Sequence, residues 1–310
     1  MDRLTLGDLF DRRLDYPDLD ASKRLSRLVG VDEVKSRLTK MLGILVNPAG
    51  PRTWSKTFHP DADLLLDYVE RRPPLVILAG DVGSGKTELA ETIGDAIARQ
   101  EDIPVTLYPL SLATRGSGKV GEMTKLVSAA FDLTYEAANK LRRNDGRAAG
   151  GVLLLVDEAD ALTQSREDGQ MHHEDRAGVN AFIRGVDRLA SQRLPAAVIL
   201  CTNRLSAIDP AVQRRAAEIF AFGRPDAAQR RAVIEAPLRQ AGMTPDEIEK
   251  IVVATGASGD RDIGFTFSDL TQRLLPTLVL DAYPDKPLSP DRALAIVENM
   301  RPTPPFRGRG

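Results

Sequence analysis

The stretch GDVGSGKT at residues 80–87 satisfies the pattern G-x-x-x-x-G-K-[ST] in full. An apolar run, LVILA at residues 75–79, precedes it, and TELAETIGDAIARQ, with apolar residues at helical spacing, follows from Thr87. A strand, a glycine-rich loop and a helix in this order predict a phosphate-binding loop. Glycines allow backbone N–H groups to turn toward phosphate oxygens, and the helix N-terminus adds partial positive charge.

Two side chains at the end of this loop have specific expected roles. Lys86 can reach the β- and γ-phosphates of a nucleotide, and the Thr87 hydroxyl can ligate Mg²⁺. The alternative is a glycine-rich turn without a ligand, which the flanking strand and helix argue against. The candidate nucleotide-binding residues of this segment are Gly80, Asp81, Val82, Gly83, Ser84, Gly85, Lys86, Thr87 and Glu88.

The tetrapeptide GSGK occurs a second time, at residues 116–119, without the rest of the pattern. Ala113 stands at the position of the first glycine, and Val120 stands at the position of the Mg²⁺-ligating hydroxyl. The flanks of the two copies do not otherwise match, so there is no internal duplication. The sequence therefore predicts one phosphate loop, and the second copy needs a different explanation.

A second apolar run, VLLLV at residues 152–156, ends in Asp157 and Glu158. Because the carboxyl ends of parallel strands meet at one edge of a sheet, these carboxylates are expected beside the phosphate loop. Asp157 would hold the hydration shell of Mg²⁺, and Glu158 would polarise the attacking water as a general base. An ordinary acidic strand end is the alternative.

A third run, AVILC at residues 197–201, leads to Asn203, whose amide can orient the water or contact the γ-phosphate. Taken alone, Asn203 also fits an ordinary turn. Further on, IDPAVQRR presents Arg214 and Arg215. Adjacent arginines usually form a solvated pair, yet a guanidinium stabilises the charge that develops in phosphoryl transfer, and a neighbouring subunit can supply it.

Length and composition limit the classes of protein that this chain can belong to. The chain has 310 residues and a formal net charge of −2, from 42 basic and 44 acidic residues. This balance gives no overall reason to expect a nucleic acid or an anionic membrane as partner. The single Cys201 excludes an intrachain disulfide and fits a reducing compartment, the charged N-terminus does not resemble a secretion signal, and no apolar run has membrane-spanning length. We therefore expect a cytoplasmic protein.

The pattern of apolar runs predicts the fold class. The three runs are apolar on both faces, as strands of a helix-covered parallel sheet are, and residues 105–108 are a weaker fourth candidate. Helical stretches separate them, which indicates βαβ units. After Pro225 four helical stretches follow without a strand, with Thr244, Ser268 and Ser289 as expected N-caps. The prediction is an α/β domain, with a three-layer parallel sheet, followed by a small all-helical lid.

The expected domain boundaries follow from these elements. An N-terminal arm or helix occupies residues 1–27, the α/β nucleotide-binding domain residues 28–225, and the helical lid residues 226–299. Residues 300–310, MRPTPPFRGRG, are rich in proline and glycine and are expected to be a disordered tail.

In this order the motifs resemble those of the AAA+ ATPases, from about Leu28 to Asp281. GDVGSGKT, LLLVDEAD, CTN and IDPAVQRR are similar to the family's two Walker motifs, first sensor and arginine finger. LVGVDEVKSRL looks like the family's adenine-pocket segment, which implies that Val29 and Gly30 bind the nucleotide. The resemblance implies ATP and Mg²⁺ as cofactors and a homo-oligomeric ring, expected to be a hexamer. It also implies Arg215, with Arg214 second, as the finger.

Two further segments, SLATRGSGKVGEMTKLV and AEIFAFGRPDAAQRRAVI, look most like the pachytene-checkpoint remodellers of HORMA-domain proteins. Bacterial relatives of that group are short and are encoded with HORMA proteins and cyclic-oligonucleotide synthases in anti-phage signalling systems. The resemblance implies an ATP-driven remodeller that disassembles a HORMA-domain signalling complex. By the same resemblance, Lys119 and Val120 would face the ring's channel as a pore loop that grips the client. A mobile glycine turn is the alternative.

The chain departs from these relatives at three places. Asp81 and Val82 replace two prolines, which puts a carboxylate beside a phosphate site without an explanation in the sequence. Leu270 stands where the second-sensor arginine would fall, with Arg273 as the nearest substitute. Lys119 stands where most relatives have a pore aromatic.

Two other functions stay open at this point. A nucleic-acid-directed loader or initiator is disfavoured by the neutral charge and by the lack of a DNA-binding module. A non-hydrolysing nucleotide sensor or scaffold would have no need of Glu158, Asn203 and Arg215 together. The segment HHED at residues 172–175 offers metal ligands, but a polar loop fits it better because no third ligand follows at suitable spacing.

Overall fold

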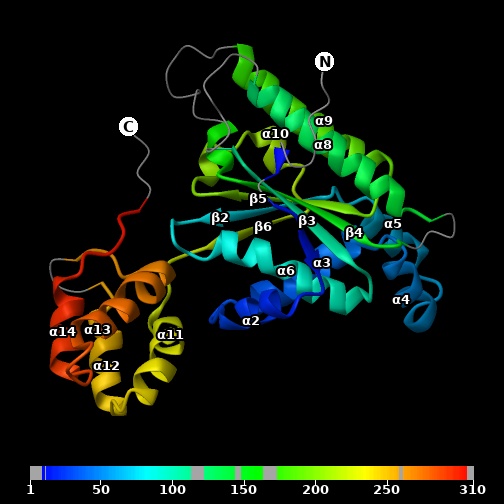
Figure 1. Ribbon diagram of the computed structural model, residues 1–310. Helices are drawn as coiled ribbons and strands as arrows, with labels where there is room; N and C mark the ends of the chain where they lie inside the picture. The colour runs from blue at the N-terminus through cyan, green and yellow to red at the C-terminus, as the bar shows by residue number, and fades with distance from the viewer. Residues whose placement is uncertain are drawn as a thin grey trace. The chain divides into compact units, whose positions relative to one another are not determined.

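A computed structural model describes residues 9–10, 12–112, 122–143, 148–162, 173–257 and 261–305 (Figure 1). The strands are β1 (Leu14–Tyr16), β2 (Leu75–Gly80), β3 (Val105–Ser111), β4 (Gly151–Asp157), β5 (Ala196–Thr202) and β6 (Glu218–Phe222). The helices are α2 (Leu19–Arg27), α3 (Asp32–Val46), α4 (Gly50–Phe58), α5 (Asp63–Glu70), α6 (Lys86–Glu101), α8 (Glu122–Leu141), α9 (His173–Ser191), α10 (Pro210–Gln213), α11 (Ala227–Gln240), α12 (Pro245–Ala254), α13 (Leu275–Ala282) and α14 (Pro290–Asn299). Short 3-10 segments, η1 (Ala159–Leu162) and η3 (Leu205–Ala207), and a π-helical segment, η4 (Asp269–Leu274), complete the described structure.

The chain divides into two compact units. Residues 1–26, 33–79 and 87–221 form the first, here called the sheet unit, and residues 27–32, 80–86 and 222–310 form the second, here called the lid unit. Residues 80–86 of the loop, and residues 28–32 of the segment expected at the adenine pocket, thus belong to the same unit as the lid helices. The domain boundaries expected from the sequence stay a prediction.

The sheet has the strand order β1-β3-β4-β5-β2-β6. The β3–β4, β4–β5 and β2–β5 pairs are parallel, so the carboxyl ends of these four strands share one edge. In register, Ser111 lies opposite Asp157, and Ala79 lies opposite Thr202. Since β5 lies between β4 and β2, its end separates the acidic end of β4 from the strand that leads into the phosphate loop.

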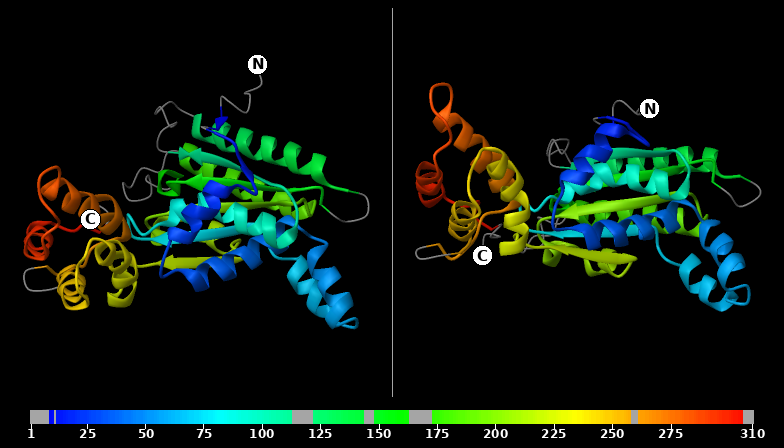
Figure 2. Two further views of the ribbon diagram at one scale, coloured as in Figure 1. Left: turned by 60° about the horizontal axis from the view of Figure 1, so that its bottom comes forward. Right: turned by 90° about the horizontal axis from the view of Figure 1, so that it is seen from below.

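Helices cover both faces of the sheet, which explains why its central strands are apolar on both sides. Helices α8 and α9 lie on one face, and α3 and α6 lie on the other (Figures 1 and 2). Between α8 and α9 the rings of Phe131 and Phe182 meet edge to face, with centroids 5.4 Å apart. Gly185 allows this close approach, because a Cβ there would come within 2.2 Å of the Phe131 ring. The predicted fold class, a three-layer α/β domain with a helical lid, is confirmed.

The N-terminal segment adds a strand that the sequence did not suggest. β1 pairs antiparallel with β3, from Leu14 opposite Leu107 to Tyr16 opposite Val105, so the sheet is mixed rather than fully parallel. The Tyr16 ring packs against Gly94 of α6, where a Cβ would come within 2.3 Å of it. Residues 12–26, which include β1 and most of α2, therefore belong to the sheet unit.

The lid helices enclose a core of their own. Buried apolar side chains from α11, α12, η4, α13 and α14 meet there, among them Ile234, Leu238, Ile251, Leu274, Leu278 and Val297. Two of the expected N-caps are present: Thr244 accepts from the Glu247 N–H in a capping box, and Ser289 accepts from the Arg292 N–H. The four predicted lid helices are observed.

The third expected cap, Ser268, is wrong. Ser268 has helical backbone angles and makes no side-chain cap. Thr266, two residues earlier, takes that role: its hydroxyl accepts from the Asp269 N–H, and the Asp269 carboxylate accepts from the Thr266 N–H, both at 3.0 Å. This reciprocal pair is a capping box, in which Asp takes the place of the usual Glu or Gln.

Residues 301–305 contact the rest of the lid unit, and the disordered tail expected for residues 300–310 stays a prediction. The Thr303 N–H and hydroxyl both donate to the Asp269 carboxylate, at 3.0 and 2.7 Å. The Thr303 carbonyl accepts from Arg224 at 2.6 Å. Thr303 is thus held by Asp269 and Arg224, although the segment around it is rich in proline.

Candidate functional site

The phosphate loop closes tightly on its own lysine. Gly83 has φ of 72°, a left-handed conformation that other residues rarely adopt. The Lys86 side chain is 6% exposed, and its Nζ donates to the carbonyls of Gly80 and Asp81 at 2.9 and 2.8 Å. Ser84 Oγ lies 3.3 Å from the same Nζ. The ammonium group is thus held inside the curl of the loop.

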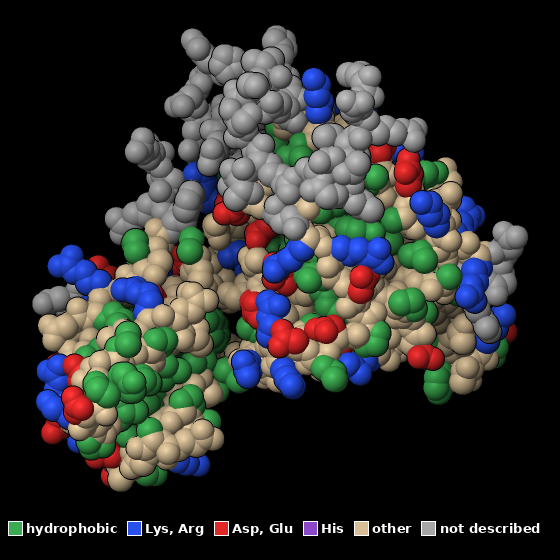
Figure 3. Space-filling view, in the orientation of Figure 1, with side chains coloured by type: hydrophobic (Ala, Val, Ile, Leu, Met, Phe, Trp, Pro, Cys, Tyr) green, Lys and Arg blue, Asp and Glu red, His purple; other side chains and the backbone are tan. Residues whose placement is uncertain are grey.

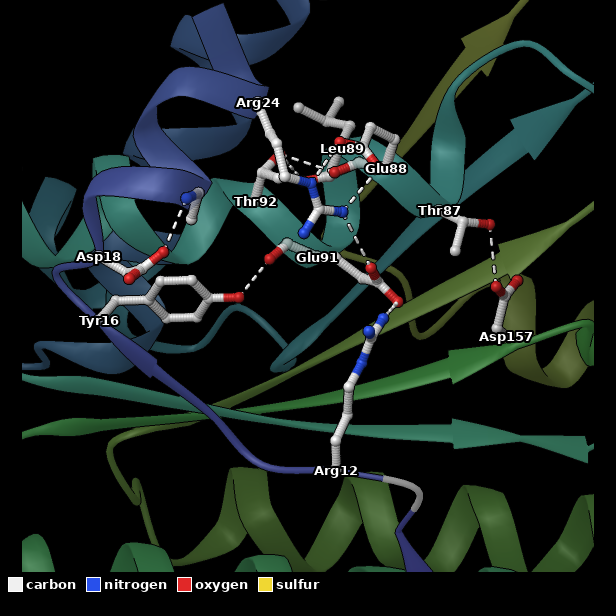
Figure 4. A network of polar contacts seen from close by, with 11 residues as sticks. Arg12, Tyr16, Asp18, Arg24, Thr87, Glu88, Leu89, Glu91, Thr92 and Asp157 are labelled. Carbon is white, nitrogen blue, oxygen red and sulfur yellow. Dashed lines mark hydrogen bonds and ion pairs between the residues drawn. The ribbon is translucent and has the colours of Figure 1, made fainter. Parts of the chain in front are cut away.

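The two predicted Mg²⁺ ligands lie together in the sheet unit. Thr87 Oγ1, at the start of α6, donates to Asp157 Oδ2 at 2.9 Å (Figure 4). Asp157 Oδ1 accepts from the Glu158 N–H at 2.8 Å. Hydroxyl and carboxylate oxygens are the ligands that Mg²⁺ prefers, and one or two protein ligands are the usual number. The donor set therefore fits this ion.

Glu158 has an unusual backbone. Its φ of 54° places a non-glycine residue in the left-handed region, which costs free energy and is often found at functional sites. Its Oε2 accepts from Ser111 Oγ at 2.8 Å. Ser111 ends β3, opposite Asp157 in the ladder, so its proximity follows from strand register. Ser111 was not predicted from the sequence, because no motif marks the end of β3.

The backbone of Asn203 is held by the buried carboxylate of Asp160, a residue that was not predicted from the sequence. Asp160, in η1, is 9% exposed. Its Oδ2 accepts from the Asn203 N–H at 3.1 Å, and its Oδ1 accepts from the Thr202 hydroxyl. Asp160 thus ties the segment after β4 to the end of β5. Its place in VDEAD, two residues after Glu158, is the signal that was available.

Arg215 pairs within its own chain. Its Nε and Nη2 donate to the two oxygens of Asp187 on α9, at 2.7 and 2.9 Å, and its Nη1 donates to the Ala211 carbonyl. The hydrogen bond to Asp187 raises the pKa of the Arg215 guanidinium. Arg214 follows α10 as its C-cap and is exposed. Use of Arg215 across an interface therefore requires that it leave Asp187.

Glu88 contacts the N-terminal segment. Both of its oxygens accept from Arg24 of α2, at 2.8 and 2.7 Å, in a bidentate pair (Figure 4). Arg24 also reaches Glu91, which in turn accepts from Arg12. These contacts tie the first turns of α6 to residues 12–24 of the sheet unit. The structure thus gives Glu88 a role in holding the helix that follows the loop.

Gly30, in the segment expected to bind adenine, contacts a lid helix. Gly30 has φ of 75°, and its carbonyl accepts from Gln229 of α11 at 2.6 Å. Val29 precedes this contact. Both residues belong to the lid unit, as do residues 80–86.

The structure explains two of the departures from the family pattern. Asp81 Oδ2 accepts from Arg224 Nε at 2.8 Å, so the unexpected carboxylate has a cationic partner within the lid unit. Leu270 is 0% exposed and belongs to the lid core, while Arg273 donates to Asp269 at 2.6 Å and to the Arg301 carbonyl. Leu270 is thus a packing residue, and Arg273 is engaged inside the lid.

The remaining candidates lie outside the described residues. Lys119 and Val120 are among them, and so is His172. In the part of the chain that the structure describes, no group of three or more His, Cys, Asp or Glu side chains could hold a metal ion. Within the same residues, no helix has the length and apolar character of a membrane span.

A hollow of about 950 Å³ lies at the opposite end of the sheet from the acidic strand ends. Its lining comes from the segments before β2, β4 and β5 and includes Arg52, Glu70, Arg142 and Arg193. None of the predicted site residues lines it, so we do not assign the nucleotide to it.

Known sequences similar to this chain are AAA-family proteins and proteins named CD-NTase-associated protein 6. The model of the AAA family, the ATPase family associated with various cellular activities, matches residues 76–224. The chain is 62% identical over 305 residues to CD-NTase-associated protein 6 of Escherichia coli strain MS 115-1, which covers 98% of both chains. A protein of the same name from E. coli strain KTE188 is 36% identical over 302 residues, which covers 97% of this chain and 98% of the relative.

Solved structures match over nearly the whole length. A chain of the E. coli MS115-1 HORMA:CdnC:Trip13 complex has a TM-score of 0.89 at 62% identity, covering 98% of this chain and 99% of that one. Rhizobiales Trip13 has a TM-score of 0.75 at 56% identity, covering 96% and 100%. Caenorhabditis elegans PCH-2, at 18% identity and a TM-score of 0.66 over 92% of this chain and 73% of its own, shares the fold. The chain therefore belongs to the AAA family of ATPases, in the group that contains CD-NTase-associated protein 6.

Proposed function

We propose that this ATPase is a ring-forming protein remodeller that disassembles a HORMA-domain signalling complex in bacterial anti-phage defence. The observation that carries this proposal is its 62% identity and TM-score of 0.89 with a chain solved in a HORMA:CdnC:Trip13 complex. Because the match covers 98% of this chain and 99% of the other, every large part of that chain has a counterpart here. A cytoplasmic location fits this role and stays a prediction.

The proposed nucleotide chemistry follows from the contacts of the site residues. Lys86 binds the β- and γ-phosphates, supported by its burial within the curl of the loop. Thr87 and Asp157 hold Mg²⁺, supported by their oxygens lying 2.9 Å apart. When bound, the ion neutralises charge on the phosphate oxygens. We expect a Mg²⁺ site of the usual kind, completed by water and phosphate oxygens.

Glu158 is the proposed general base. Its carboxylate accepts a proton from the attacking water, and Asn203 orients that water. The Glu158 carboxylate is held by Ser111 at 2.8 Å, and the position of Asn203 is fixed through Asp160. Both residues therefore have defined positions before the reaction, which is what an efficient proton transfer requires.

The proposed ring, expected to be a hexamer, is supported by exposed apolar side chains. In the lid unit Val279, Leu280 and Tyr283 are 54, 73 and 75% exposed, and Figure 3 shows hydrophobic side chains over the lid helices. In the sheet unit Phe58, Leu64 and Tyr68 are 64, 80 and 76% exposed. Groups of exposed apolar side chains close together in the sequence are consistent with an interaction surface. Arg215 would act in the neighbouring subunit's site, as the proposed finger.

A trapping experiment tests the proposed function. The Glu158→Gln protein should bind ATP without hydrolysing it, and should then retain a purified bacterial HORMA-domain protein through gel filtration. Wild-type protein with ATP should release that client, and protein without nucleotide should retain less of it. Absence of any ATP-dependent client binding by the Glu158→Gln protein would contradict the proposal. Stimulation of ATP turnover by DNA would favour a loader instead.

A further inference from the structure

The carboxylate of Asp81 is fully engaged inside the lid unit. Its Oδ1 accepts from the Val82 N–H at 2.9 Å, and its Oδ2 accepts from Arg224 Nε at 2.8 Å. The side chains of Asp81 and Arg224 are only 18% and 16% exposed. A largely buried ion pair of this kind loses much of its solvation, so removal of one partner leaves a costly unpaired charge.

Arg224 joins three segments that are far apart in the sequence. Besides Asp81 in the phosphate loop, it donates from Nη1 to the Gly264 carbonyl at 2.7 Å and from Nη2 to the Thr303 carbonyl at 2.6 Å. The planar guanidinium presents several donors in a fixed geometry, which suits it to hold three acceptors at once. The three N–H donors of lysine share one side-chain nitrogen, so lysine does not reproduce the planar spread of donors that Arg224 uses.

The backbone of the phosphate loop also forms hydrogen bonds with other residues of the lid unit. The Asp81 N–H donates to the Phe222 carbonyl at 3.3 Å, and the Ser268 N–H donates to the Gly83 carbonyl at 3.0 Å. A Cβ at Gly80 would come within 1.9 Å of the Phe222 carbonyl oxygen, and one at Gly83 would lie 2.9 Å from Thr266 and Ser268. The loop is therefore packed against the lid along its first four residues.

A second buried carboxylate, that of Asp269, holds Thr303, the residue whose carbonyl accepts from Arg224. Asp269 is 0% exposed and accepts from Thr266, from Thr303 and from Arg273. Burial alone would raise the pKa of Asp269, but these hydrogen bonds outweigh it and hold the pKa below its ordinary value. The Thr303 carbonyl that Arg224 contacts is thereby fixed from behind.

We propose that Asp81 and Arg224 form a latch that couples nucleotide affinity to the lid and to residues 301–305. This rests on the proposed assignment of residues 80–87 as the ATP-binding loop. Asp81 does not repel the phosphates, because Arg224 neutralises it, and Arg224 is a positioning residue that sets the curvature of the loop through Asp81. Nucleotide binding and the arrangement of the lid segments then influence each other, as two linked equilibria must.

A double-mutant cycle on the full chain tests the latch. We would measure the dissociation constant of ADP by calorimetry for wild type, Arg224→Ala, Asp81→Ala and the double variant. Arg224→Ala should weaken ADP binding by about tenfold or more, because it leaves the Asp81 carboxylate unpaired beside the phosphates. The double variant should bind ADP more tightly than Arg224→Ala does, since the unpaired charge is gone. Arg231→Ala, which removes a more exposed partner of Glu249 in the same unit, should leave ADP affinity unchanged.

Three outcomes would overturn the latch. The first is independent, multiplicative effects of the two substitutions on ADP affinity. The second is an Arg224→Ala protein whose thermal midpoint falls equally with and without ADP, which would indicate a purely structural role. The third is full ADP affinity in Arg224→Lys, because Lys keeps the charge and loses the three-way contact. ATP turnover by wild type against Glu158→Gln, measured in parallel, separates failure of the latch from failure of the proposed function.

Discussion

At the scale of single residues, Lys86 and Glu158 are proposed to serve separate steps. Lys86 is enclosed by the phosphate loop, whereas Glu158 lies at the end of β4, hydrogen-bonded to Ser111. In the proposed mechanism, Lys86 holds the phosphates and Glu158 accepts a proton. Substitution of either should therefore affect a different measured quantity.

Lys86→Ala should weaken ATP binding by about tenfold or more, because a charged hydrogen-bond donor to the phosphates is lost. Glu158→Gln should leave ATP affinity near the wild-type value and lower turnover about 100-fold or more, because glutamine does not accept the proton. Nucleotide titration and phosphate release measure the two effects. Turnover near the wild-type rate in Glu158→Gln would contradict the assignment of the general base.

The residues that the sequence predicted at this site are those carried by a local motif. The loop at 80–87 and the pair Asp157–Glu158 are recognisable because strand, loop and helix are consecutive. Asp160 and Ser111 were missed because their contacts depend on strand order and register. Asp81 was unexplained for the same reason: its partner, Arg224, lies 143 residues away in the sequence.

At the scale of secondary structure, the packing of α8 on α9 depends on one glycine. A Cβ at Gly185 would lie 2.2 Å from the Phe131 ring, inside the hydrophobic core of the sheet unit. The helical pattern of both segments was visible in the sequence, but the need for glycine at this crossing was not. The strand β1 was also missed, because three residues are too few to show an alternating pattern.

Gly185→Val should lower the free energy of unfolding by about 1–3 kcal/mol, because the added side chain overpacks the core against Phe131. Gly223→Val is the matched control: nothing lies within 4 Å of its added Cβ, and its effect should stay within about 0.5 kcal/mol. Chemical denaturation measures both. Addition of Phe131→Leu to Gly185→Val should recover part of the loss, and unchanged stability in Gly185→Val would contradict this packing.

The buried Asp269 makes the stability of the lid unit depend on pH. Its folded-state pKa is held below the ordinary 3.8, so its carboxylate contributes stability fully above that pH. This contribution is lost as the pH falls from 3.8 through the depressed folded-state value. The free energy of unfolding of Asp269→Asn should fall less steeply in this window than that of wild type. Asp246→Asn, on the surface of α12, should keep the wild-type slope, and equal slopes for all three proteins would contradict the assignment.

At the scale of the whole molecule, the family resemblance seen in the motifs is confirmed by relatives that cover nearly the full chain. The assembly of this chain into a ring stays a proposal. Arg215 forms an ion pair with Asp187 of its own subunit. A role in the neighbouring subunit's site therefore requires that the nucleotide there compete with Asp187 for the guanidinium. Lys119 and Val120, proposed to grip the client, lie outside the described residues.

Mixed rings test the trans role of Arg215. Arg215→Ala alone should suppress turnover without abolishing ATP binding, because the guanidinium stabilises charge in the transition state. Lys86→Ala alone should suppress turnover by loss of nucleotide. Some interfaces of a mixed ring combine an intact loop with an intact arginine, so a mixture should regain part of the turnover. A complete lack of recovery in verified mixed rings would contradict the trans assignment.

The most direct measurement of the central proposal follows client release and phosphate release in parallel. A HORMA-domain protein in its partner-bound state is mixed with the wild-type chain and ATP, with Glu158→Gln and with the Lys119→Ala, Val120→Ala double variant. We predict that wild type releases the client as phosphate appears, that Glu158→Gln does neither, and that the double variant hydrolyses ATP without releasing the client. Client release that continues unchanged in Glu158→Gln would contradict an ATP-driven remodeller.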